Sequence, residues 1–123
     1  MAGMIGQLRS VVIDCPDPRA LASFYSELLG LPLDPDGTDG DGWVVISGNG
    51  HRLAFQQALN LRPPTWPEPG VPQQFHLDVQ VEDVEAAEKQ VLALGARRLP
   101  GGGQDFRVYA DPAGHPFCLV FDV

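Results

Sequence analysis

The sequence predicts an α+β fold in which one βαβββ module occurs twice in tandem. The evidence is an internal repeat: the segments beginning at Ser10 and His76 each contain an alternating run, an Asp, an apolar helical stripe and a Gly, in that order. A β-rich hairpin pattern then follows in both copies. We therefore expect a single domain over residues 1–123, with module one at about 5–58, a connector at 59–72 and module two at about 73–123.

The first copy begins with a strand over residues 10–15, where polar and apolar residues alternate. A helix is expected to follow Asp17, whose side chain can accept the free amides of the first turn, with Pro18 at the first helical position. Its apolar stripe includes Leu21 and Phe24, and Gly30 is placed to end it. The strand face that packs on this helix is expected to carry Val11, Ile13 and Cys15, and the opposite face Ser10, Val12 and Asp14.

Each copy ends in a hairpin pattern, at 41–56 and at 104–121, with turns rich in Gly, Asn, Asp or Pro. The short strand expected between helix and hairpin has only weak signals, at 31–37 and 97–103. In the last strand of module one, alternation places Leu53 and Phe55 on one face and Arg52, Ala54 and Gln56 on the other. In the last strand of module two, it places Phe117, Leu119 and Phe121 on one face and Cys118 and Val120 on the other.

The connector, LNLRPPTWPEPGVP, is too rich in proline for a helix or a central strand. We expect a stiff loop. Trp66 lies in its middle and is too large and apolar to stay in water without a reason, so we expect it to pack on or cover another part of the protein.

The second copy starts with unbroken alternation over 74–81, followed by a helix after Asp83 that Gly95 ends. One face of this strand would hold Gln74, His76, Asp78 and Gln80. Two interpretations stay open for the faces turned away from the helices: they line a shared concavity, or they meet solvent as one side of an antiparallel sheet often does. For Asp14 and Gln80 we expect solvent.

Composition excludes several classes of protein. A formal net charge of -8, with only 8 Lys and Arg, argues against a nucleic-acid partner. No apolar run approaches the roughly 18 residues of a spanning helix, and the start lacks the pattern of a signal peptide. We expect a cytoplasmic protein without a membrane partner. Cys15 and Cys118 lie in apolar runs without CxxC spacing, which predicts reduced, mostly buried thiols.

The segments VVIDCPDPRALASFYSELLG, HLDVQVEDV and DPAGHPFCLVF, with PPTWP before the second copy, resemble the vicinal oxygen chelate superfamily. The resemblance is to its short glyoxalase-like members, related to glyoxalases, bleomycin-resistance proteins and extradiol dioxygenases, and covers nearly the whole chain. It implies that the paired modules form a curled mixed sheet with a half-barrel cleft, often within a homodimer.

The resemblance also implies where a divalent metal would bind. In metal-dependent relatives the ligands come from the first and last strands of each module, typically His or Gln and then Glu. The matching positions here hold Ser10, Ala54, His76 and Cys118. Only His76 is a conventional ligand, so we expect no metal cofactor, although Gln56 and Cys118 would contribute in another register or with a thiophilic ion.

His76 is the strongest candidate for a catalytic residue because histidine is the side-chain type most often used for acid–base chemistry near neutral pH; its alternative role is a hydrogen bond within the sheet. A ligand pocket is mostly apolar with a few polar groups. On that basis the expected ligand-binding residues are Trp43, Arg52, Phe55, Gln56, Trp66, Asp78, Tyr109 and Cys118.

Three functions follow from these features. The leading prediction is a small-molecule-binding protein that uses the cleft between the modules without the usual divalent metal, its ligand aromatic or hydrophobic. The alternative is an enzyme of lyase, isomerase or dioxygenase type, with His76 as base or metal ligand. A structural or interacting subunit is the third.

Overall fold

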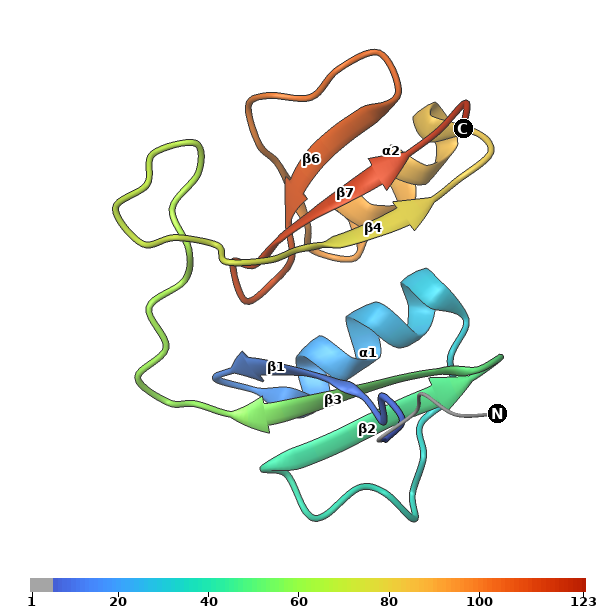
Figure 1. The fold of residues 1–123 in the computed structure, drawn as a ribbon, viewed down its shortest axis with the longest axis vertical. Coiled ribbons are helices and arrows are strands. Elements are labelled where there is room, and N and C mark those ends of the chain that lie inside the picture. The colour runs from blue at the N-terminus through green and yellow to red at the C-terminus, as the bar shows by residue number, and fades with distance from the viewer. Residues whose placement is uncertain (1–5) are drawn as a thin grey trace.

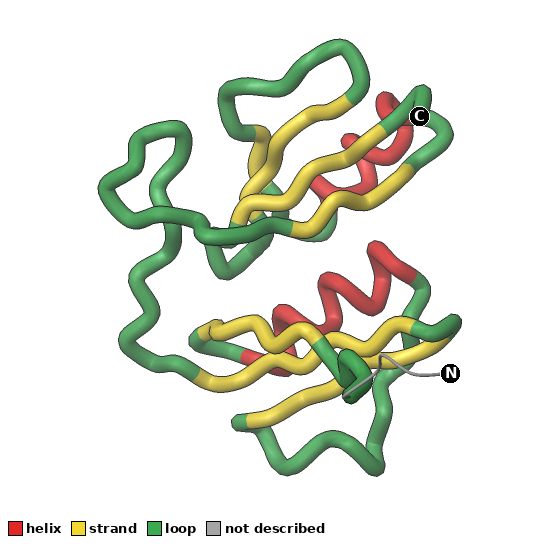
Figure 2. Tube along the Cα trace, in the orientation of Figure 1, coloured by secondary structure: helices red, strands yellow, loops and turns green. Residues whose placement is uncertain are grey.

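Two similar halves follow each other along the chain in the computed structural model, which describes residues 6–123 (Figures 1 and 2). Residue 5, the expected start of module one, lies outside the described residues. The first half contains β1 (Val11–Cys15), α1 (Pro18–Leu29), β2 (Trp43–Gly48) and β3 (His51–Gln57). The second contains β4 (Leu77–Gln80), α2 (Val84–Ala93), β5 (Arg97–Arg98), β6 (Phe106–Ala110) and β7 (Pro116–Val120).

Each half has its own mixed sheet. The first has the order β1-β3-β2, with β1 parallel and β2 antiparallel to β3. The second has the order β4-β7-β6-β5, with β4 parallel and β6 antiparallel to β7. The predicted α+β fold of repeated modules is confirmed. Hydrogen bonding divides the strands between two sheets, and they do not close into a barrel within residues 6–123.

The weakly signalled strand between helix and hairpin is short in both halves. In the second half it is β5, and in the first it is reduced to a bridge between Leu33 and Ile46. Next to this bridge, the backbone amide of Asp34 still donates to the carbonyl of Val45 at 2.8 Å. Pro32 and Pro35 flank this segment and have no N–H to donate, which limits a longer ladder.

The helix boundaries follow the predicted caps. The amide of Ala20 donates to Asp17 Oδ1 at 3.2 Å, and the amide of Ala86 donates to Asp83 Oδ1 at 3.1 Å. Gly30 takes a φ of 69°, the left-handed conformation that ends α1 with little strain. Within the described residues, neither helix is long and apolar enough to cross a membrane.

The buried side chains of both halves join in one hydrophobic cluster, with α1 lying between the two sheets (Figure 1). The ring of Phe24 on α1 meets the ring of Phe117 on β7, with centroids 5.8 Å apart. Tyr25 stacks on Phe55 of β3 at 5.8 Å, and Tyr109 of β6 stacks on Phe117 at 5.5 Å. Both halves therefore depend on the same aromatic core.

The strand faces follow the predicted alternation. Ile13 and Cys15 are buried in β1, whereas Val12 and Asp14 are exposed. The first strand of the second half, β4, is shorter than predicted, because it begins at Leu77 and not at residue 74. Gln74 has a φ of 67°, which interrupts the extended backbone there.

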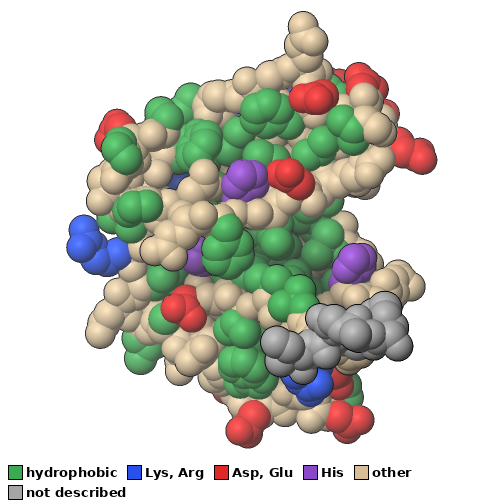
Figure 3. All heavy atoms as spheres, in the orientation of Figure 1, with side chains coloured by type: hydrophobic (Ala, Val, Ile, Leu, Met, Phe, Trp, Pro, Cys, Tyr) green, Lys and Arg blue, Asp and Glu red, His purple; other side chains and the backbone are tan. Residues whose placement is uncertain are grey.

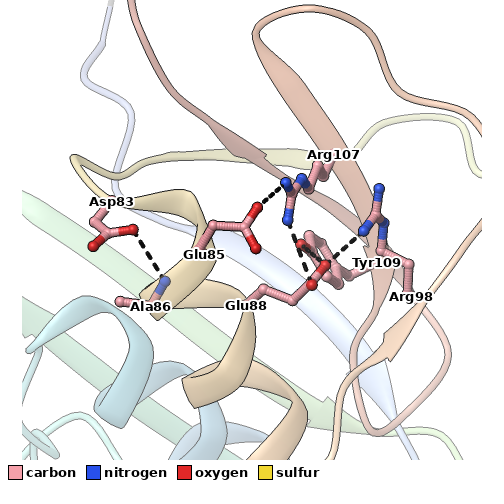
Figure 4. A network of polar contacts seen from close by, with 7 residues as sticks. All are labelled: Asp83, Glu85, Ala86, Glu88, Arg98, Arg107 and Tyr109. Carbon is pink, nitrogen blue, oxygen red and sulfur yellow. Dashed lines mark hydrogen bonds and ion pairs between the residues drawn. The ribbon is translucent and has the colours of Figure 1, made fainter.

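A network of charged groups ties α2 to its sheet (Figure 4). Glu88 accepts from the Tyr109 hydroxyl at 2.7 Å and pairs with Arg98 at 2.7 Å and Arg107 at 3.4 Å. Arg107 also pairs with Glu85 in the first turn of α2. These contacts lower the pKa of Glu88, the hydrogen bond from Tyr109 most strongly. The network fixes the orientation of the second helix.

Candidate functional site

A cavity of about 490 Å³ lies between the two modules. Its walls come from β1, the end of β3, the residues that follow β3 up to the start of β4, and the turn before β7. On the face drawn in Figure 3, hydrophobic side chains lie along the junction of the halves, with histidine side chains beside them. The cavity has the size and mixed lining of a small-molecule site.

Two of the predicted site residues line this cavity. Gln56 reaches it from the end of β3, and His76 from the residue before β4. Asp78 is an exposed neighbour of His76, and its Oδ1 lies 3.1 Å from His76 Nε2. A β-strand places residues i and i+2 on one face, and this pair keeps that relation although His76 lies just outside the strand.

The other predicted ligand-binding residues lie in the sheets or on surface loops and do not line this cavity. Arg52 pairs with Asp34 at 3.2 Å. Trp66 donates from its indole N–H to the carbonyl of Pro100 at 2.6 Å and packs on Gly101. Of the remaining four, Trp43 is half-buried, whereas Phe55, Tyr109 and Cys118 are buried.

Most of the cavity wall was not predicted from the sequence, including the side chains of Asp14, Tyr25, Phe75 and His115. We expected Asp14 to face only solvent, and alternation along β1 does not show that the connector returns beside it. His115 lies in the turn just before β7. Its ring Nε2 lies 2.6 Å from the backbone carbonyl of Asp14, so it joins the modules as well as lining the cavity.

Tyr25 is held at the back of the cavity by a buried carboxylate. Its hydroxyl donates to Asp111 Oδ2 at 2.7 Å, while Asp111 Oδ1 accepts from the amides of Ala113 and His115 at 2.9 and 3.0 Å. Asp111 is only 2% exposed. Burial raises the pKa of the Asp111 carboxyl and, together with the Asp111 charge, that of the Tyr25 hydroxyl. This pair fixes α1 to the turn before β7.

A cluster of metal-ligand types lies beside the cavity. The ligand atoms of His76, Asp78 and Cys118 are all within 4.8 Å of one another. Burial raises the pKa of the Cys118 thiol to about 11, and the charge of Asp78 adds to the effect. The thiol is therefore protonated at neutral pH, and a metal would have to displace that proton.

The residues fit one metal arrangement and not another. Donors from the first and last strands of both modules cannot form a site, because Ala54 has only a methyl group and is buried. By contrast, His76, Asp78 and Cys118 supply nitrogen, oxygen and sulfur donors from module two alone. Such a set suits a borderline ion such as Zn²⁺ better than Mg²⁺ or Ca²⁺.

The chain resembles known proteins over nearly its full length. A family model described as "Glyoxalase-like domain" matches residues 10–120. None of the curated proteins matches the chain.

Several solved structures share the fold. A glyoxalase/bleomycin resistance protein/dioxygenase family enzyme from Burkholderia phytofirmans has a TM-score of 0.74 at 16% identity, covering 96% of this chain and 100% of that one. The fosfomycin resistance protein FosX from Listeria monocytogenes has a TM-score of 0.72 at 16% identity, with 98% and 94% covered. A possible glyoxalase from Bacillus cereus has a TM-score of 0.70 at 18% identity, with 95% and 99% covered. With the family match over residues 10–120, these observations show that the chain belongs to the glyoxalase-like domain family of the vicinal oxygen chelate fold.

Proposed function

We propose that this protein binds a small organic molecule in the cavity between its modules, without the usual divalent metal set of its relatives. The observation that carries the proposal is the cavity itself, about 490 Å³ in volume and lined from both modules. Cavities of this size, with apolar walls and a few convergent polar groups, typically bind organic ligands.

The wall chemistry supports a ligand with both apolar and polar parts. Leu61, Val71 and Phe75 supply apolar surface. Gln56 and His76 supply groups that donate or accept hydrogen bonds. A fosfomycin resistance protein among the structural neighbours shows that this fold occurs in proteins named for resistance to a small molecule.

The test is a thermal-shift screen of aromatic and natural-product compounds on the purified protein, with a variant that fills the cavity. Val12→Trp places an indole at the wall, and Leu33→Trp adds the same ring to an exposed site outside this cavity. We expect hits to raise the Tm of the wild type and of Leu33→Trp but not of Val12→Trp. Hits that stabilise Val12→Trp equally would show that binding occurs elsewhere, and a screen without hits would contradict the proposal.

We propose an enzymatic reaction that uses His76 as the second candidate function, because His76 lies both at the cavity and in the cluster with Asp78 and Cys118. Without a metal, the imidazole would act as a general base toward a bound substrate. A divalent ion held by the three residues would polarise a ligand oxygen. In the metal-free form, Asp78 would orient the His76 ring.

Elemental analysis of untagged protein and a Co²⁺ titration separate the two forms of this candidate. A Co²⁺ site that includes Cys118 would give thiolate-to-cobalt absorption that Cys118→Ser abolishes and that Cys15→Ser, at the other buried cysteine, retains. Absence of both bound metal and this absorption would contradict the metal form. Unchanged turnover of an identified substrate by His76→Ala would contradict either form.

The cytoplasmic location and the homodimer stay predictions. Large apolar side chains at the surface, such as Leu8 and Leu59, are compatible with a partner copy. Sedimentation velocity measures the oligomeric state directly, and a monomer at all concentrations would contradict the predicted homodimer.

A further inference from the structure

One wall of the cavity is built differently from the others. About half of the lining residues, among them Leu61 and Val71, belong to the connector or to the few residues that follow it before β4. This segment runs along one side of the junction, from the end of β3 to the start of β4 (Figure 1). Five of the connector residues are prolines, which have no N–H to bond to the sheets. The wall therefore depends on few contacts.

The walls that come from the two modules are fixed to each other. The buried hydroxyl of Tyr25 on α1 donates to Asp111 at 2.7 Å, and His115 Nε2 lies 2.6 Å from the carbonyl of Asp14 on β1. The shared aromatic core lies beneath both contacts. Separating the modules would break these buried contacts together, so the module walls are the stable part of the cavity.

The connector is held to module two at two places. The indole N–H of Trp66 donates to the carbonyl of Pro100 at 2.6 Å. Among the described hydrogen bonds, this is the only one that joins residues 62–72 to another part of the chain. The second contact is apolar: Pro63 lies against Gly114, so closely that a Cβ on Gly114 would come within 2.6 Å of the Pro63 Cβ.

The middle of the connector is closed on itself. The amide of Thr65 donates to the carbonyl of Val71 at 2.8 Å, and the amide of Val71 donates to Thr65 Oγ1 at 2.9 Å. The Thr65 hydroxyl also donates to the carbonyl of Glu68 at 2.6 Å. Prolines stiffen the chain between these residues. Residues 65–71 therefore form one unit, in which Trp66 contacts module two and Val71 lines the cavity.

We propose that the connector is a gate over the cavity, with the hydrogen bond from Trp66 to Pro100 as its latch and the contact of Pro63 with Gly114 as its pivot. When the latch breaks, residues 65–71 swing away together, Val71 leaves the wall and the cavity opens while the modules stay in place. Opening by this route breaks one exposed hydrogen bond, whereas separating the modules breaks buried ones. The latch also accounts for a tryptophan in a proline-rich loop. The inference goes beyond the proposed function because it requires no particular ligand.

The experiment is ¹⁵N relaxation dispersion on the full chain without ligand, which detects a minor state of about 1% that exchanges in microseconds to milliseconds. We expect one common exchange rate for the indole N–H of Trp66 and the backbone amides of Thr65 and Val71. The amides of Phe55 in β3 and Val108 in β6, both buried, should show no exchange at that rate.

Variants of the latch test its role. Trp66→Phe keeps a ring but removes the N–H, so the open population measured at Val71 should rise about three- to tenfold, the effect of one hydrogen bond. Trp66→Ala removes the ring as well and should raise this population further. The matched control is Trp43→Phe, at the half-buried tryptophan of β2 outside the cavity lining, and it should leave the population unchanged. Because Trp66 lies outside the hydrophobic cluster, the Tm of its variants should stay near that of the wild type.

Three results would overturn the inference. The first is an open population that is the same in the wild type and in Trp66→Phe, including the absence of exchange at Val71 in both. The second is exchange at Trp66 that Val71 does not share. The third is exchange of Phe55 and Val108 at the rate of Val71, which would mean that the modules separate. The proposed function fails separately, in the thermal-shift screen, because the dispersion measurement uses no ligand.

Discussion

The hydrogen bond between Tyr25 and Asp111 should be one of the main polar links between the modules. Tyr25→Phe removes only the hydroxyl. The ring keeps its stacking on Phe55 and its edge contact with Phe24, so the loss should report the bond to Asp111 and little else. Asp111 stays buried after the change and loses the only partner of its Oδ2 among the described hydrogen bonds.

The size of the effect follows from the acceptor. A hydrogen bond to an ionised group contributes about 1.5–3 kcal/mol to the free energy of unfolding. For 123 residues at about 2.1 cal/mol/K per residue, each kcal/mol moves the Tm by about 4 °C. We therefore expect Tyr25→Phe to lower the Tm by about 6–12 °C at neutral pH.

Urea unfolding followed by circular dichroism measures the free energy, and a double-mutant cycle with Asp111→Asn isolates the pair. The matched control is Tyr109→Phe, which breaks a hydroxyl bond to the less buried Glu88 inside module two. We expect a coupling of at least about 1 kcal/mol between Tyr25 and Asp111. Additive single changes, or a loss for Tyr25→Phe no larger than for the control, would refute the argument.

Three further predictions concern other groups. Burial raises the pKa of Asp111 above its ordinary value of 3.8, so the protonated carboxyl favours folding; this stabilisation is present below pH 3.8 and is lost as the pH rises through the folded-state pKa. The Tm of wild type minus that of Asp111→Asn should therefore fall as the pH rises over this window, and a constant difference would contradict it. Asp17→Ala and Asp83→Ala should each lower the free energy of unfolding by about 1 kcal/mol in urea titrations, and a near-zero loss for either would show that its cap is dispensable. Because burial raises the pKa of Cys15 to about 12 and that of Cys118 to about 11, neither thiol should react with iodoacetamide in the folded protein at neutral pH, whereas both should react in urea; rapid labelling without denaturant would disprove this.

Much of the fold was predictable because it depends on local patterns. The caps at Asp17 and Asp83 act on amides three residues away, and the alternation in β1 separates buried Ile13 from exposed Asp14. β4 was predicted to begin three residues too early, because a left-handed residue such as Gln74 leaves no mark in a pattern of apolar and polar residues.

The candidate site was predicted only in part. His76 and Gln56 were identified because the alternation of polar and apolar residues assigned each to a face turned away from a helix, and both line the cavity although His76 lies just before β4. Trp66 was expected at the ligand, but the structure places its indole on the Pro100 carbonyl, a contact that depends on where the loop at 99–103 meets the connector. Tyr25 lies on α1, and its position there does not reveal that it lines the cavity or that its hydroxyl bonds to Asp111, 86 residues along the chain.

The sequence by itself determined the repeated module, its helix boundaries and the buried face of each strand, because these follow from interactions among residues a few positions apart. The tertiary structure alone decided that Tyr25, His115 and the turn at Gln74 meet around one cavity. Such a meeting depends on how two modules and a proline-rich connector pack together, and contacts between residues so far apart in the chain have no periodic signature.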